Sequence, residues 1–567
     1  MIEKLKKNFF IKYLLLIYFI NLLFLIVFFN HSGIDMECDT SHSYLVGRTI
    51  VQLLFGGTND LVFSFRPPGY PIFLLLSGVY FFNSFWAVII SQSILTFIAL
   101  TFIYYSFSLY KIFYGVLFSI IYILLFFLYT HIKGTTEIHF VNFLLVISIC
   151  SLIIFLKKEK IFFYYLSILS IIVAVFSRGD TAPLLLTIFI FINYVLLQSK
   201  NINLKNKIKS FSIISLIIFF TFLTWFLAKG LFFYYYGNEN EIRNKKVFIE
   251  SFTSLSFNHQ GGAQIFWKLQ SYDRIQINIK YNTKIKNYLD VNNGPKSKEL
   301  YNVLLDAFKN KKIVTKILGW EGRMIGLGND DSKTDTWGKH YAEIENSPKK
   351  IVDRIFDKNF ESYYYPDQIK EILAKQISRV RGDKLLKDVS KEIIKNNPNL
   401  KKEYLSNFIR AFGLNYNAAD QVLRLDLPTG VDYSNFESFN AGNCPKFALT
   451  EKMFNEYKYE YEKRSVLKNE NSKIFKNFVN IERNLTRRIL SIIFIISLFL
   501  IFFYKEKLIV IFLNSSFIMS NLLVSYFIPP VGKTENYLLT LLVFNSFYFF
   551  IFINEKNWFF DKNIEKK

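Results

Sequence analysis

Long apolar runs constrain the fold of this chain more than any other feature. Several of them approach or exceed about 18 residues, the length a helix needs to cross a bilayer. The chain has 567 residues, 51% of them hydrophobic and 64 of them Phe, a composition that is rare in soluble enzymes of this size. We therefore expect a mainly α, polytopic membrane protein with about ten spans, at residues 9–29, 85–108, 112–130, 138–156, 161–177, 181–198, 211–229, 489–504, 508–527 and 537–553.

The positions of the basic residues predict the orientation of these spans. The segment 71–82 is apolar but short, and we expect it to be a helix that lies in the outer leaflet without crossing. The lysine-rich loops near 111, 157–160 and 200–209 then share one side with the N-terminus, and the positive-inside rule makes that side the cytoplasm. The arginines at 483–488 run against this arrangement. Much of the net charge of +23 falls in these short loops, so we expect no nucleic-acid partner.

The polar residues divide the chain into three parts. We expect an N-terminal membrane part at 1–229, which includes an outer loop at 30–71. Residues 230–486 would form an inserted, mostly helical extracytoplasmic domain, and residues 487–567 would form the C-terminal membrane helices. Apolar residues recur at helical spacing in the inserted part, near 296–316, 348–361, 366–382 and 399–412.

The first outer loop holds the residues best suited to chemistry. It carries the acids Asp35, Glu37 and Asp39. A carboxylate near a bilayer is partly desolvated, so its pKa rises toward the working range of a general base. Downstream, the run Arg66-Pro67-Pro68-Gly69-Tyr70-Pro71 forms a rigid bend that holds one cation near the membrane surface. A fixed cation that faces carboxylates suggests chemistry on a lipid-linked phosphate, although a solvated loop would also explain the acids alone.

Three features together resemble the GT-C superfamily of polyprenyl-phosphate-sugar-dependent glycosyltransferases. The match is closest to the family of protein mannosyltransferases and aminoarabinose transferases. It covers about residues 9–200, with weaker agreement over the last three spans. The first feature is Asp39, followed by Tyr44 and then by the Arg66–Pro71 run. The second is Thr135-Thr136-Glu137 at the start of a span. The third is Ser177-Arg178, followed by Pro183 and a run of leucines.

The resemblance implies a role for each matched residue. Asp39 would be the catalytic base, and Glu137 would orient the acceptor or share the base role. Arg66 and Arg178 would hold the donor phosphate. The family often has an Arg-Tyr pair before a late helix, where this chain has Asn536-Tyr537, and Lys533 would supply that cation as a point charge. The supporting residues would be Asp35, Glu37, His42, Tyr44, Tyr70, Asp180 and Tyr537.

Plainer interpretations of two matched residues stay open. Arg178 would serve equally as an interface anchor. Glu137 would serve as a helix N-terminal charge that the helix dipole favours.

The implied activity is transfer of a sugar from a polyprenyl-phosphate donor, with inversion, to a glycan, lipid or protein. The site would lie on the extracytoplasmic face of a bacterial inner membrane. The chemistry requires no cofactor when arginines neutralise the phosphate, although the clustered acids leave room for a divalent cation. A transporter or lipid flippase is one alternative, but the charges gather at one face rather than at midplane. An O-antigen ligase or polymerase is another, and the acidic first loop argues against it.

Overall fold

The structure is a computed structural model, and it is built from helices. It describes residues 2–31, 43–44, 46–48, 50–51, 54, 68–124, 132–133, 137–178, 181–199, 201–236, 288–310, 347–357, 365–398, 450–467 and 477. Across these ranges the regular structure is helical and contains no strand. The spans expected after residue 487 lie outside the described residues. The long apolar helices are α1 (Ile2–His31), α5 (Phe85–Ser108), α6 (Ile112–Leu124), α8 (Ile138–Lys158), α9 (Ile161–Ser177), α10 (Ala182–Gln198) and α11 (Leu204–Tyr236).

Four of the described helices are long and apolar enough to cross a membrane. These stretches are Asn8–Phe29, Phe85–Ser108, Ile138–Lys158 and Leu204–Thr224. Inside the molecule, 89% of the α8 stretch is buried, against 17% for α1 and 11% for α11. Helix α8 is therefore the centre of an apolar bundle, and α1 and α11 present apolar surface outward. Apolar surface on that scale suits contact with lipid, so the protein is an integral membrane protein.

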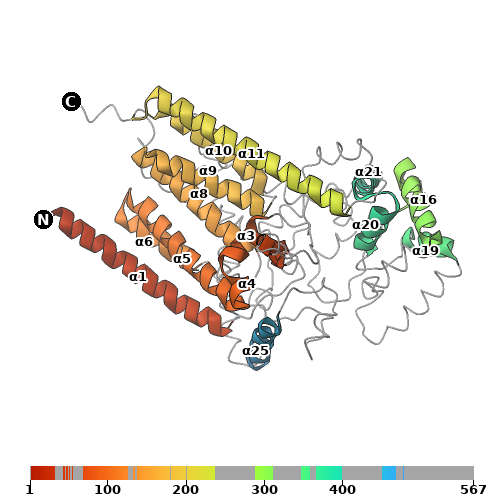
Figure 1. Ribbon diagram of the computed structural model, residues 1–567, viewed down its shortest axis with the longest axis horizontal. Coiled ribbons are helices and arrows are strands. Elements are labelled where there is room, and N and C mark those ends of the chain that lie inside the picture. The colour runs from red at the N-terminus through yellow and green to blue at the C-terminus, as the bar shows by residue number, and fades with distance from the viewer. Residues whose placement is uncertain are drawn as a thin grey trace.

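Neighbouring helices in the bundle run antiparallel. Near one end, the Tyr104 hydroxyl of α5 donates a hydrogen bond to the carbonyl of Phe10 in α1, at 3.0 Å. Near the other end, the rings of Phe29 and Trp86 meet edge to face, with centroids 6.3 Å apart. As the residue number rises along α1, that of its contact on α5 falls. Figure 1 shows the same alternation through α8, α9, α10 and α11.

Two short helices lie at one end of the bundle and do not cross it. Helix α3 spans Gly69–Leu76 and α4 spans Val79–Phe82, so they contain eight and four residues. A bilayer crossing needs about 20. Gly78 separates them with φ of +81°, a conformation that glycine adopts without strain. Both lie beside the end of the bundle where α1 finishes (Figure 1), so α5 begins at the end where α1 finishes.

The two ends of the bundle differ in charge. Lys111 precedes α6, Lys157 and Lys158 close α8, and Lys205 and Lys207 lie in the first turn of α11. Because the helices alternate, all of these lysines lie at the end where α1 begins. The opposite end holds α3, α4 and the start of α8. This distribution is the one that the positive-inside rule predicts.

The polar part of the chain contains a second, separate hydrophobic core. It is built from α16 (Pro295–Lys309), α19 (Pro348–Ile355), α20 (Tyr365–Gln376), α21 (Arg379–Asn396) and the 3₁₀ turn η2 (Val291–Asn293). The expected helix at 366–382 is interrupted at Ile377 and Ser378, so it covers α20 and only the first residues of α21. The expected 399–412 lies outside the described residues. The carboxylate of Glu392 accepts hydrogen bonds from the backbone N–H groups of Lys296 and Ser297, at 2.9 and 2.8 Å. An acid from α21 thus caps the positive end of α16.

Candidate functional site

An ion pair joins α8 to α9 at the end of the bundle opposite the lysines. Nη1 of Arg178 lies 3.2 Å from Oε1 of Glu137, and the two side chains are 15% and 7% exposed. Glu137 immediately precedes α8, and Arg178 immediately follows α9. Because these helices are antiparallel, the start of one meets the finish of the other. Two sequence-distant candidate residues therefore share one location, where low exposure strengthens their charge-assisted hydrogen bond.

The proline-flanked segment reaches the same place through Gly69. A Cβ atom on Gly69 would lie 2.5 Å from Oγ of Ser177 and 2.7 Å from its backbone nitrogen. No side chain fits there, so only glycine lets α3 pack directly on the last turn of α9. Ser177 is the residue before Arg178. Pro68 and Gly69 are thus held next to Arg178, whereas Arg66 itself lies outside the described residues.

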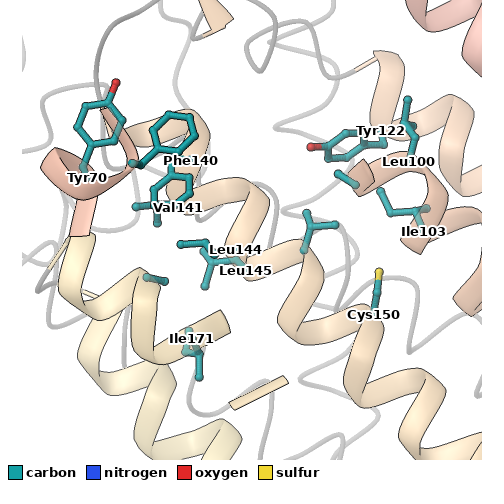
Figure 2. Close-up of a cluster of buried hydrophobic side chains, with 14 of the residues drawn as sticks. Tyr70, Leu100, Ile103, Tyr122, Phe140, Val141, Leu144, Leu145, Cys150 and Ile171 are labelled. Atoms are coloured by element: carbon teal, nitrogen blue, oxygen red, sulfur yellow. The ribbon is translucent and has the colours of Figure 1, made fainter. Parts of the chain in front are cut away.

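Tyr70 is buried beneath this site rather than exposed in it. The side chain is 1% exposed. Its ring stacks on Phe73 with centroids 5.8 Å apart, and lies 6.3 Å from the ring of Phe140 in the first turn of α8. Figure 2 shows Tyr70 and Phe140 grouped at one end of the apolar cluster. Tyr70 therefore locks α3 against α8 close to Glu137.

Tyr44 is one of the few residues of the first outer loop that the structure describes, and it is tightly packed. Its carbonyl accepts a hydrogen bond from the Tyr80 hydroxyl at 3.0 Å, and its ring lies 5.7 Å from that of Phe85. The side chain is 2% exposed. Burial raises the pKa of the Tyr44 phenol well above its ordinary value, and the nearby Tyr70, Tyr80 and Glu456 raise it further. The phenol is neutral at physiological pH, and Tyr44 is anchored beside α4.

The structure thus brings together Glu137, Arg178, Tyr70 and Tyr44 at one end of the bundle. It does not test the remaining candidates. Across the part of the chain that the structure describes, no group of three or more His, Cys, Asp or Glu side chains is placed to hold a metal ion. The candidates outside the described residues are Asp35, Glu37, Asp39, His42, Arg66, Asp180, Lys533 and Tyr537.

A buried ion pair that involves Lys133, four residues before Glu137 in the sequence, escaped the sequence analysis. Nζ of Lys133 lies 2.9 Å from Oε2 of Glu460, and donates a second hydrogen bond to the carbonyl of Phe29 at 2.7 Å. Its side chain is fully buried. One signal could have found it, because Lys133 is a lysine close to a span on the side expected to be outside. Glu460 stands in a polar helix with no distinguishing pattern.

Comparisons with known proteins add little to this geometry. No protein-family model matches the chain, and no curated protein matches it. A solved structure of ArnT from Cupriavidus metallidurans, bound to undecaprenyl phosphate, aligns with 94% of this chain and 77% of that chain. The sequence identity is 9% and the TM-score is 0.30. A score this low carries no argument about fold or activity, so the site rests on the chain's own residues.

Proposed function

We propose that this chain is a membrane glycosyltransferase that moves a sugar from a polyprenyl-phosphate donor to an extracytoplasmic acceptor. The observation that supports it best is the Glu137–Arg178 pair at 3.2 Å, beside the Gly69–Ser177 contact. Three stretches singled out from the sequence, far apart along the chain, meet at one end of an apolar bundle. Helix α1 ends at His31 at that same end, so the acidic loop begins there. A lipid carrier would enter between helices, with its phosphate at this level.

The arginines would act on the donor. Arg178 donates a hydrogen bond to Glu137, and this contact would hold the guanidinium at the membrane surface instead of letting it extend into water. Arg66 precedes the proline bend whose continuation packs beside Arg178. Two guanidinium groups at one level would neutralise the donor phosphate. Their stabilising effect would increase in the transition state, as the departing polyprenyl phosphate gains negative charge. On this proposal Glu137 acts chiefly through Arg178.

Asp39 would act on the acceptor. Its carboxylate takes the proton of an acceptor hydroxyl or amine as that atom attacks the anomeric carbon. The new glycosidic bond forms while the bond between the anomeric carbon and the phosphate oxygen breaks. The electron pair of that bond leaves with the polyprenyl phosphate, whose added negative charge faces the arginines. One attack from the face opposite the phosphate inverts the anomeric configuration, and no further reactant is required.

The test is a transfer assay on purified protein in lipid nanodiscs. Polyprenyl phosphates carrying glucose, mannose, galactose or aminoarabinose serve as donors, host envelope extract supplies acceptors, and released polyprenyl phosphate is measured. Asp39→Asn should lower kcat by about 10²–10⁴-fold, the range for loss of a general base. Arg66→Ala should raise the KM for the donor. Asp306→Asn and Arg381→Ala, at exposed positions of the polar helices, serve as matched controls.

Two results would contradict the proposal. Release of polyprenyl phosphate from none of the donors by the wild-type protein would remove the transferase assignment. Full turnover in Asp39→Asn would remove Asp39 from the base role while leaving the donor assignment standing.

A further inference from the structure

A helix from the polar part of the chain returns to the membrane bundle and borders an open cavity at the surface there. Helix α25 (Glu451–Leu467) lies beside α4 and the start of α5 (Figure 1). The cavity has a volume of about 530 Å³ and is lined by Trp86 of α5 and by Glu451, Lys452, Asn455, Glu456 and Tyr459 of α25. That volume falls within the range of about 300–1,000 Å³ that small-molecule sites occupy.

The wall that α25 forms is fixed by contacts on several sides. Met453 and Phe454 are buried in the hydrophobic core of the bundle. The carboxylate of Glu456 accepts hydrogen bonds from the Ser84 hydroxyl at 2.6 Å and from the backbone N–H of Phe85 at 2.8 Å. A carboxylate at that position also complements the positive end of α5. One turn after Glu456, Glu460 pairs with the buried Lys133. The cavity is therefore a built feature and not a gap between loosely placed segments.

Trp86 is held just as firmly on the opposite wall. The ammonium of Lys133 lies 5.7 Å from the centroid of its ring, and the Phe29 ring packs against it edge to face. The side chain is nevertheless only half-buried. Tyr459 faces the same cavity with 66% of its surface exposed. Two aromatic side chains therefore line the cavity from different helices, and both keep surface for a ligand to contact.

The polar lining narrows the class of ligand. Two carboxylates against one ammonium disfavour a phosphate or another anion. The charged side chains of the lining also disfavour an acyl or isoprenoid chain, because a hydrocarbon ligand would displace the water that hydrates these charges. A sugar fits both parts of the lining, since its ring faces are C–H surfaces that contact aromatic rings and its hydroxyls bond to carboxylate and amide groups.

We propose that the cavity between α25 and the start of α5 binds a sugar residue. It opens at the same end of the bundle as Glu137 and Arg178. The carboxylate of Glu456 in its lining also lies close enough to Tyr44, in the first outer loop, to raise the pKa of that phenol. A sugar held there would lie beside the acidic loop and not along the lipid-facing side of the bundle. Its assignment as an acceptor subsite rests on the proposed transferase function, whereas the binding of a sugar does not.

The experiment measures binding directly, without a donor. Full-length protein in nanodiscs is mixed with glucose, galactose, mannose, glucosamine or N-acetylglucosamine, and saturation-transfer NMR records which sugars bind. At least one sugar should bind the wild type. Tyr459→Ala should weaken that binding by about three- to tenfold, the effect of losing one aromatic contact, while Tyr459→Phe should retain it. Lys458→Ala, one residue away on α25 and outside the cavity lining, is the control.

Two outcomes would overturn the site. One is that no sugar of the set shows saturation transfer to the wild type. The other is that Tyr459→Ala binds as tightly as the wild type. Unchanged unfolding midpoints in the variants show that α25 stays docked, which the exposure of Tyr459 leads us to expect. Neither outcome bears on Asp39 or Arg66, so this site and the transferase proposal fail separately.

Discussion

Single buried charges explain how distant segments of this chain are held at one end of the bundle. Lys133 is fully buried yet satisfied, because a carboxylate and a backbone carbonyl accept its hydrogen bonds and two aromatic rings surround it. Taking two charges out of water is costly, so such a pair contributes little net stability by itself. Removing one partner is different, because it leaves the other charge buried and uncompensated. The pair therefore favours one position of α25.

Breaking the Lys133–Glu460 pair should destabilise the protein strongly. Glu460→Ala should lower the free energy of unfolding by about 3–5 kcal/mol, since Lys133 would remain buried without its carboxylate. The double variant Lys133→Met with Glu460→Met should recover most of that loss. Denaturant unfolding in detergent measures both. Asp306→Ala, in a pair whose side chains are more than 60% exposed, should change stability by about 1 kcal/mol or less. Additive losses in the double variant would contradict the coupling.

The two roles considered for Glu137 differ in which kinetic constant they affect. If Glu137 holds Arg178, Glu137→Gln should raise the donor KM by about tenfold, because a charge-assisted hydrogen bond is worth about 1.5–3 kcal/mol and the amide keeps part of it. The value of kcat should then change little. A fall in kcat of about 10²-fold or more with unchanged KM would instead give Glu137 a share of the base role. Initial rates against donor concentration separate the two.

At the scale of elements, apolar run length predicted most of the bundle. Helices α5, α8 and α9 begin and end within two residues of the expected 85–108, 138–156 and 161–177. Run length is a local property, and a bilayer imposes it directly. The docking of α25 could not be predicted, because the Ser84–Glu456 contact joins residues 372 positions apart and depends on single polar groups without periodicity. The contact between Glu137 and Arg178 likewise depends on two single polar groups, and it becomes visible only when the antiparallel packing of α8 on α9 is known.

The close packing of α3 on α9 makes a prediction for Gly69. Gly69→Ala places a methyl group against Ser177, and the backbone of α9 cannot move aside without displacing Arg178. Overpacking of this kind costs about 1–3 kcal/mol. We expect a lower unfolding midpoint together with a higher donor KM. Leu76→Ala on the same helix is the control, since that side chain is 80% exposed. Wild-type stability and KM in Gly69→Ala would show that α3 does not pack here as described.

At the scale of the whole molecule, the two ends of the bundle differ in the residues and helices that they carry. One end collects lysines in short loops, and the other collects the candidate site, α3, α4 and α25. This asymmetry follows from alternating helices plus two helices too short to cross. If α3 and α4 together formed a crossing, every later helix would reverse, and Glu137 would leave the side where the first outer loop begins. The function proposed for the site therefore depends on the orientation of the whole bundle.

Cysteine labelling tests that orientation. The native Cys38, Cys150 and Cys444 are replaced by Ser, and single cysteines are introduced as Tyr459→Cys on α25 and Leu204→Cys at the start of α11. Both positions are well exposed, at 66% and 69%. A membrane-impermeant maleimide should label the Tyr459→Cys protein in intact spheroplasts, and the Leu204→Cys protein only after lysis, because the positive-inside rule predicts that the lysine-rich end faces the cytoplasm. The reverse pattern would invert the protein and place Glu137 and Arg178 in the cytoplasm. Labelling of both positions in intact spheroplasts would contradict the alternation itself, since α11 begins at the lysine-rich end and α25 contacts the opposite end, where α5 begins.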